Sequence, residues 1–178
     1  ALAAPISLLA MADVARTSAP TSAMQPLATT QQQADTSAIV HGLLSDSRYA
    51  YRPRALDASL GAEVWKRYLE ALDPSKVYLT SQDVASVPDA PTKTIAAVKG
   101  GDYAPMYAVF DIYRKRVVER SNYARGLLKQ DIFTFTGNDR YDYDREDVAW
   151  GDAAALDTQW KQSVRSDWLR LKLAGKQP

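Results

Sequence analysis

The chain of 178 residues contains no cysteine and a single histidine, His41. Without cysteine it has no disulfide framework, no thiolate metal site and no cysteine nucleophile. One histidine also excludes most metal clusters built from imidazole ligands. His41 falls on or near the polar side of a predicted helix, where a solvated or hydrogen-bonded histidine is far more common than a metal ligand.

An excess of basic charge is also missing. The 22 lysines and arginines balance 21 acidic residues, so the net charge is +1 and the pI is near 8.1. Nucleic-acid binders carry a clear basic excess, so we expect no nucleic-acid partner. No run reaches the ~18 to 20 apolar residues that a membrane-spanning helix requires.

Catalytic motifs are sparse as well. The sequence has no glycine-rich phosphate loop and no serine in a nucleophile elbow. The pair Ser75-Lys76 lies on a predicted turn with nothing to select it as a dyad. Glu70 and Glu119 are the helical carboxylates available for acid–base work, and both have polar neighbours, whereas such work needs burial to shift the pKa. We therefore predict no catalytic residue and no cofactor-binding residue in this chain.

An acidic stretch near residue 142 raises the question of calcium. Its alternating carboxylates are Asp142, Asp144 and Glu146. An EF-hand loop that starts at Asp142 needs glycine in its sixth position and glutamate in its twelfth, and these positions hold Asp147 and Ala153. Arginines between the acids neutralise them. A salt-bridged loop is favoured and no metal site is predicted, although a metal-dependent enzyme that uses these three carboxylates is a third hypothesis.

The first 38 residues are rich in Ala, Ser, Thr, Gln and Pro and cannot bury enough apolar surface to order themselves. We predict a flexible tail over 1–38. Residues 1–12, ALAAPISLLAMA, look like the second half of a secretory signal peptide followed by small residues suited to cleavage. A short surface helix, or a remnant foreign to the protein, is the alternative for these twelve residues.

The longest helical pattern covers about 103–129, roughly 39 Å at 1.5 Å per residue. Large apolar residues recur along it at steps of three and four, and include Met106, Val109, Phe110, Tyr113 and Val117. If Phe110 is fully buried, Phe110→Ala should cost about 3 to 5 kcal/mol. A cost below about 1 kcal/mol would mean that the stripe faces solvent or a domain absent from this chain.

Further helices are predicted over 37–49, 57–72, 91–98 and 152–174, with a single turn starting at Ser81. Asp57, Asp102 and Asp152 are suitable N-caps, and Gly100-Gly101 supplies a C-terminal stop. An ordered loop follows the long helix, pinned by the aromatic residues Phe133, Phe135, Tyr141, Tyr143 and Trp150. The predicted fold is all-α: an irregular multi-helix domain around one long central helix, with no internal repeat that would indicate a solenoid.

Four stretches in register carry a family resemblance. They are EVWKRYLEALDPSKVYLTSQDV (Glu63–Val84), YRKRVVERSNYARGLLK (Tyr113–Lys129), FTFTGNDRYDYDREDVAW (Phe133–Trp150) and LDTQWKQSVRSDWLRLKLAGK (Leu156–Lys176). Each alone is weak, but their shared order and spacing are specific. Together they resemble the N-terminal helical region of tail-specific, or carboxy-terminal processing, proteases of the Gram-negative periplasm.

The resemblance implies two parts: 1–38 as a signal-peptide remnant with a low-complexity tail, and 39–178 as the N-terminal helical domain. In that family a PDZ domain and a protease domain with a Ser–Lys dyad follow, and the parent enzyme acts on proteins with apolar, unstructured C-termini. None of those motifs is present, so no catalytic residue is carried over and this chain alone is expected to be inactive.

The remaining expected roles are to enclose the substrate chamber, orient the PDZ domain or dock a helical-repeat lipoprotein adaptor. A stand-alone helical interaction domain, acting as adaptor or inhibitor, is the alternative.

Overall fold

The computed structural model describes residues 25–50, 52, 54–130, 132–138, 140–145 and 147–176. This part contains six helices and no strand, which confirms the all-α prediction. The helices are α1 (Gln31–Ser45), α2 (Ala58–Leu72), α3 (Ser81–Ala85), α4 (Ala90–Gly100), α5 (Ala104–Lys129) and α6 (Ala153–Leu173). The predicted signal-peptide remnant, 1–12, lies outside the described residues.

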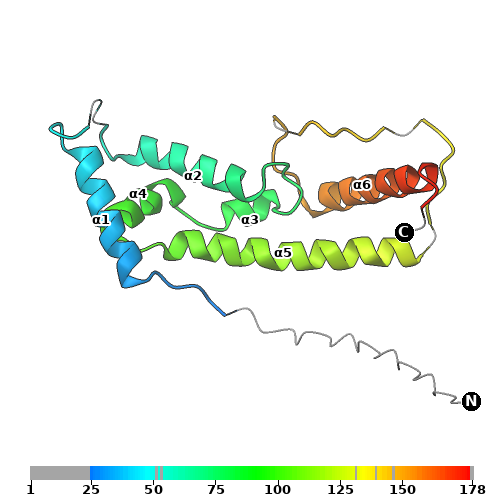
Figure 1. Cartoon of the computed structure of the whole chain (residues 1–178), viewed down its shortest axis with the longest axis horizontal. Helices are drawn as coiled ribbons and strands as arrows, with labels where there is room; N and C mark the ends of the chain where they lie inside the picture. Colours follow the sequence, from blue (N-terminus) through cyan, green and yellow to red (C-terminus); the bar gives the residue numbers. More distant parts are fainter. Residues whose placement is uncertain are drawn as a thin grey trace, which may run out of the picture.

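Helix α5 is the long central helix, with 26 residues against the predicted range of about 103–129. It runs along nearly the whole length of the helical part of the molecule (Figure 1). Helices α1, α2 and α4 gather at its beginning, and we call this region, with α5 up to Tyr113, the groove end. Helix α6 lies along the second half of α5, and we call these two segments the arm.

Helix α1 begins earlier than predicted. Thr30 and Gln33 form a capping box, in which the Thr30 hydroxyl accepts from the Gln33 N–H and the Gln33 side chain accepts from the Thr30 N–H. Residues 31–38, predicted as flexible tail, are therefore helical, and the helix ends at Ser45 rather than at residue 49.

The large apolar residues of α1 do not form a buried face. Ile39, Val40, Leu43 and Leu44 are all exposed. The packed side is small and polar instead: Ser37 is buried, and its hydroxyl donates to the Val98 carbonyl at 2.8 Å and contacts the Tyr103 hydroxyl at 2.6 Å. The buried side of α1 is therefore not the side that carries its large apolar residues.

Small residues bring the helices of the groove end close together. A Cβ added at Gly61 of α2 would lie 2.1 Å from the Pro91 carbonyl oxygen of α4. One added at Gly101, which has a φ of 72° and ends α4 in the left-handed conformation, would lie 2.6 Å from the Ala34 Cα of α1. The core around this contact is Trp65, Leu69, Leu79, Ala90, Ala97, Met106 and Val109.

The loop after α2 is organised by Asp73, which is buried. Its carboxylate accepts from three successive backbone N–H groups, those of Val77, Tyr78 and Leu79, at 2.8 to 2.9 Å. The Val77 carbonyl in turn accepts from Trp160 Nε1 of α6 at 2.6 Å. This loop therefore connects the groove end to the arm.

Helix α3 is fastened to the middle of α5. Thr80 and Asp83 form its capping box, and Arg116 donates two hydrogen bonds of 2.9 Å to the Asp83 carboxylate. Burial would raise the pKa of Asp83, but the hydrogen bonds from Arg116 and Thr80 outweigh that effect and lower it.

In the arm, Leu127 and Leu156 are buried, and Arg120 forms an ion pair with Asp157 of α6. Asp152 caps α6 as predicted, with its carboxylate accepting from the Ala155 N–H. Asp57 caps α2 as predicted too. Asp102 lies one residue before the N-cap of α5, yet its carboxylate still accepts from the Ala104 N–H.

The loop from α5 to α6 is pinned by only part of the predicted aromatic set. Trp150 packs against the core and Phe135 lies under the Lys172 ammonium. Phe133 and Tyr141 are partly buried. Tyr143 is 63% exposed. Its ring packs edge-on with the ring of Tyr141, and its hydroxyl forms a hydrogen bond with the Ser166 hydroxyl.

Candidate docking groove

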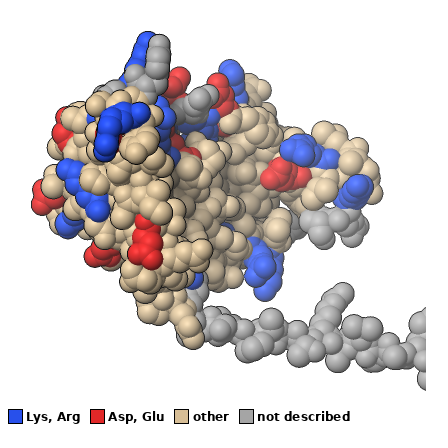
Figure 2. Space-filling view, turned by 60° about the vertical axis from the view of Figure 1, so that its left-hand side comes forward, with Lys and Arg blue, Asp and Glu red and all other residues tan. Residues whose placement is uncertain are grey.

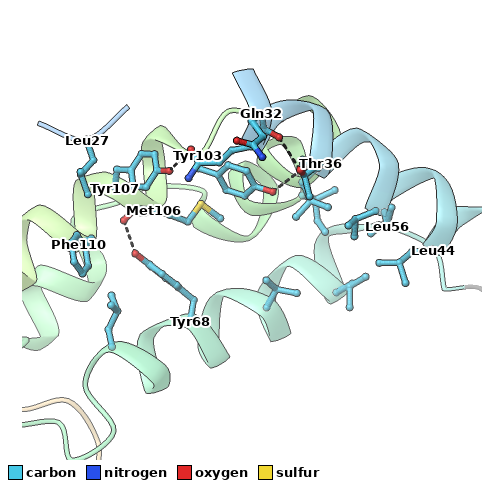
Figure 3. A pocket seen from close by; sticks show the side chains of 18 residues that line it. Leu27, Gln32, Thr36, Leu44, Leu56, Tyr68, Tyr103, Met106, Tyr107 and Phe110 are labelled. Atoms are coloured by element: carbon cyan, nitrogen blue, oxygen red, sulfur yellow. Dashed lines mark hydrogen bonds between the residues drawn. The ribbon is translucent and has the colours of Figure 1, made fainter. Parts of the chain in front are cut away.

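A wide apolar groove of about 1100 Å³ opens at the groove end (Figure 3). Helix α4 contributes Ile95 and Val98, and α1, α2 and the start of α5 contribute the remaining helical walls. The principal apolar lining residues are Val40, Leu44, Leu56, Leu60, Val64, Leu72, Ile95, Val98, Met106 and Phe110. Such a concave apolar surface is typical of a binding site.

None of the described residues that line this groove is Asp, Glu, Lys or Arg. Figure 2, in which this end of the molecule is turned forward, shows a broad uncharged area with charged side chains mostly toward its margins. The polar lining groups are the side chains of Gln32, Gln33, Thr36, Ser37, Tyr68, Tyr103 and Tyr107. A ligand in the groove would therefore meet apolar carbon and a few hydroxyl and amide groups.

Most of those polar groups are already hydrogen-bonded. Tyr68 donates to the Met106 carbonyl at 2.7 Å, and Tyr107 donates to the Gln33 side-chain oxygen at 3.2 Å. Burial, with smaller contributions from Tyr107 and Asp111, raises the pKa of Tyr68 to about 12. The phenol is thus neutral at physiological pH and serves as a brace between α2 and α5 rather than as an acid or base.

One rim of the groove is covered by the segment before α1. Arg114 donates to the Gln25 carbonyl at 3.1 Å, and the Tyr103 N–H donates to the Thr29 hydroxyl at 3.0 Å. These bonds hold residues 25–30 along α5, so that Leu27 lies over the groove beside Tyr107 and Phe110 (Figure 3). We call residues 25–30 the strap.

Phe110 is only partly buried and lines the groove. The cost of about 3 to 5 kcal/mol expected for Phe110→Ala depended on full burial of the ring, and the ring is not fully buried. Its neighbours Met106 and Val109, which belong to the same apolar stripe, are buried in the core. The stripe on α5 thus divides between the domain core and an open surface.

Three of the residues considered for catalytic chemistry line one cleft, and the fourth lies apart from it. Glu70, Ser75 and Lys76 line a separate polar cleft of about 730 Å³, together with Asp144, Arg145 and Asp147. Lys76 is buried in a left-handed backbone conformation, and Arg145 donates to the Ser75 carbonyl. Glu119 lies elsewhere, paired with Arg116. His41 is partly buried on α1.

Of the three carboxylates considered for calcium, Asp142 and Asp144 are exposed and Glu146 lies outside the described residues. Within the described part of the chain, no group of three His, Cys, Asp or Glu side chains is arranged to hold a metal ion. Nor is any helix there long and apolar enough to cross a membrane.

The groove itself escaped the sequence analysis. The available signal was in α1, where the apolar residues at 39, 40, 43 and 44 form one broad face and the rest of the helix carries a single acidic residue, Asp35. A surface helix of a complete domain has one apolar stripe and an opposite charged face. An uncharged helix of this kind indicates a neighbour on a second side.

Comparison with known proteins now decides the family. Residues 42–178 match the tail specific protease N-terminal domain family. The chain belongs to this family. A tail-specific protease of Haemophilus influenzae is 28% identical over 128 residues, which cover 71% of this chain.

The aligned part spans only 18% of the length of that relative. The chain thus corresponds to the N-terminal, protease-associated domain of such proteins, as the resemblance of the four motifs predicted. The groove is therefore a surface of a domain that belongs to a much longer polypeptide in its relative.

Proposed function

We propose that this chain is the non-catalytic N-terminal domain of a periplasmic serine endopeptidase of the tail-specific type. In this proposal a PDZ domain and a protease domain with a Ser–Lys dyad belong to the same polypeptide. The whole enzyme processes or degrades proteins from apolar, unstructured C-termini. The domain match over 42–178 is the observation that carries the proposal.

The proposed task of the domain is scaffolding. It would enclose the substrate chamber and dock either the PDZ domain or a helical-repeat lipoprotein adaptor. An uncharged groove that the described residues leave largely open supports a docking role. The apolar stretch within residues 1–12, followed by small residues, supports export by a signal peptide to the periplasm.

The intact polypeptide tests this proposal. We expect it to cleave a reporter protein that carries an unstructured apolar C-terminal tail, and to leave the same reporter with a charged tail largely uncut. Replacement of the serine of the proposed dyad by alanine should abolish cleavage. An intact polypeptide without PDZ and serine peptidase segments would overturn the proposal. Recovery of the protein from the cytoplasmic fraction would overturn its proposed periplasmic location.

A stand-alone interaction domain is the second candidate. The exposed apolar residues of α1 favour it, since a free adaptor or inhibitor needs such a surface. A polypeptide that ends naturally near residue 178, and that alters the activity of a separate protease when added to it, would favour this candidate over the first.

A further inference from the structure

Helices line the sides and the bottom of the groove, and among the described residues only the strap lies over it. Helices α1, α2 and α5 all pack on α4, which leaves Ile95 and Val98 of α4 facing the space that they surround. Val40 is 42% exposed and Leu44 is 51% exposed on its α1 wall. The strap covers only the rim near Tyr107 and Phe110, so within the described residues most of the apolar lining is left exposed or only partly buried.

The backbone chemistry of the walls favours a helix as the occupant. Three helices and α4 line the groove, and their backbone N–H and C=O groups are used within the helices. An extended peptide would bury its own backbone groups there without partners, which is costly. The strap avoids this cost at the rim through Arg114 and Tyr103. A helix satisfies its backbone internally and needs only an apolar face.

The lining residues set the size of that face. On α1 they extend from Gln32 to Leu44 and on α2 from Leu60 to Leu72. Each of these stretches is about 18 Å long at 1.5 Å per residue, or a little over three helical turns. An occupying helix would therefore present apolar residues at i, i+3, i+4 and i+7 over about three turns.

The scarcity of charged residues in and beside the groove favours a permanent partner. Interfaces that form and dissociate carry polar and charged rims, whereas permanent ones resemble a domain core cut in half. None of the described residues that line the groove is charged, and Asp35 is the only acidic or basic residue among the 15 of α1, His41 counted as neutral. The domain spans 18% of its relative, so in that protein most of the polypeptide is covalently joined and available at high effective concentration.

We propose that the groove is filled in cis by the uncharged, apolar face of one helix, about three turns long, from the polypeptide to which this domain is joined. The proposal rests on the proposed function, because that function supplies the joined polypeptide. The strap then lies at one end of the bound helix. The bound helix packs on a second side of α1, which agrees with the scarcity of charged residues in α1.

Cysteine labelling tests the proposal, since the chain has no cysteine of its own. Val40→Cys places a thiol on the groove wall, and Ile39→Cys, its matched control, places one on the adjacent residue of α1 that does not line the groove. Both variants are made in the intact polypeptide. N-ethylmaleimide labelling of the peptide that contains each thiol is followed by mass spectrometry, natively and in denaturant. Leu44→Cys is a second probe of the wall.

The expected result is that native labelling at Val40→Cys and Leu44→Cys is at least tenfold slower than at Ile39→Cys, at every protein concentration. Equal, fast labelling at all three positions would overturn the proposal. Equal protection at all three would also overturn it, since a larger partner would then cover α1. Protection that grows with concentration would assign the groove to a second copy, and protection only after adding a lipoprotein adaptor would assign it to that partner.

The same preparation is assayed for cleavage of the apolar-tailed reporter. Cleavage with an open groove would remove this inference and leave the proposed function intact. An inactive polypeptide without a protease segment would remove the proposed function itself.

Discussion

The groove end and the arm are both built on α5 but are held together in different ways. At the groove end, small residues such as Gly61, Gly101 and Ala97 let helices approach until their backbones touch. In the arm, α6 is held beside α5 by Arg120 and Asp157 and by a few buried residues such as Leu156. Close apolar packing tolerates little change of shape, whereas partly exposed charge tolerates much.

The difference explains where the open surface lies. Helices that meet through small residues leave their large apolar side chains pointing elsewhere, and on α1 these point to the groove or to solvent. The arm also exposes apolar residues, such as Val118, Leu169 and Leu173, but charged residues lie between them in the sequence. A continuous uncharged surface is therefore a property of the groove end.

The largest expected difference between the two regions is in how a glycine-to-alanine substitution changes the free energy of unfolding. Gly61→Ala should lower the free energy of unfolding by about 3 kcal/mol, because the added methyl group meets the Pro91 carbonyl and a backbone cannot rotate away. Gly126→Ala in the arm has open space around it and should raise the free energy of unfolding by about 0.5 to 1 kcal/mol. Urea unfolding followed by circular dichroism measures both; equal effects would contradict the contrast.

Truncation of Phe110 should lower the free energy of unfolding by less than truncation of its smaller, buried neighbour Met106. Phe110→Ala should lower the free energy of unfolding by about 1 to 2 kcal/mol, because its ring is only partly buried. Met106→Ala, at a buried position, should cost about 2 to 5 kcal/mol. A loss above 3 kcal/mol for Phe110→Ala in this chain would mean that the groove is closed in solution.

The ion pair of the arm should have a modest, local effect. Arg120→Ala should cost about 1 to 2 kcal/mol, because water can solvate the half-exposed Asp157 after the change but the mostly buried Arg120 side chain loses its packing on Tyr123. Hydrogen exchange should quicken in α6 and stay unchanged in α4. Arg170→Ala, which removes the exposed pair with Asp167, is the control and should leave exchange in both helices unaltered. Faster exchange in α4 would show that the two regions unfold as one.

Acid should weaken the attachment of α3 to α5 at the junction of the two regions. The pKa of Asp83 is below its ordinary value of 3.8, so its contribution to stability is complete above about pH 3.8 and is lost as the pH falls further through the folded-state pKa. Urea midpoints measured from about pH 6 to pH 2 should decrease less for Asp83→Asn than for the unchanged chain. Parallel decreases would contradict this assignment.

Much of the fold could be predicted because its signals are local. The caps Asp57 and Asp152, the stop at Gly101 and the long apolar repeat of α5 all act within a few residues. The start of α1 was missed even though its signal, Thr30 with Gln33, is equally local. It was outweighed by the low-complexity composition around it.

The groove could not be predicted, since it depends on which side of each helix meets α4. The sequence by itself determined that the chain is helical, that α5 is its spine and that four motifs in register belong to one protease family. Only the tertiary structure decided that Ser37, rather than Ile39 or Leu43, faces the core, and that Phe110 lines an open surface. The physical reason is that burial depends on close contact between distant segments, and the contacts of Gly61 with Pro91 and of Gly101 with Ala34 have no periodicity from which to read them.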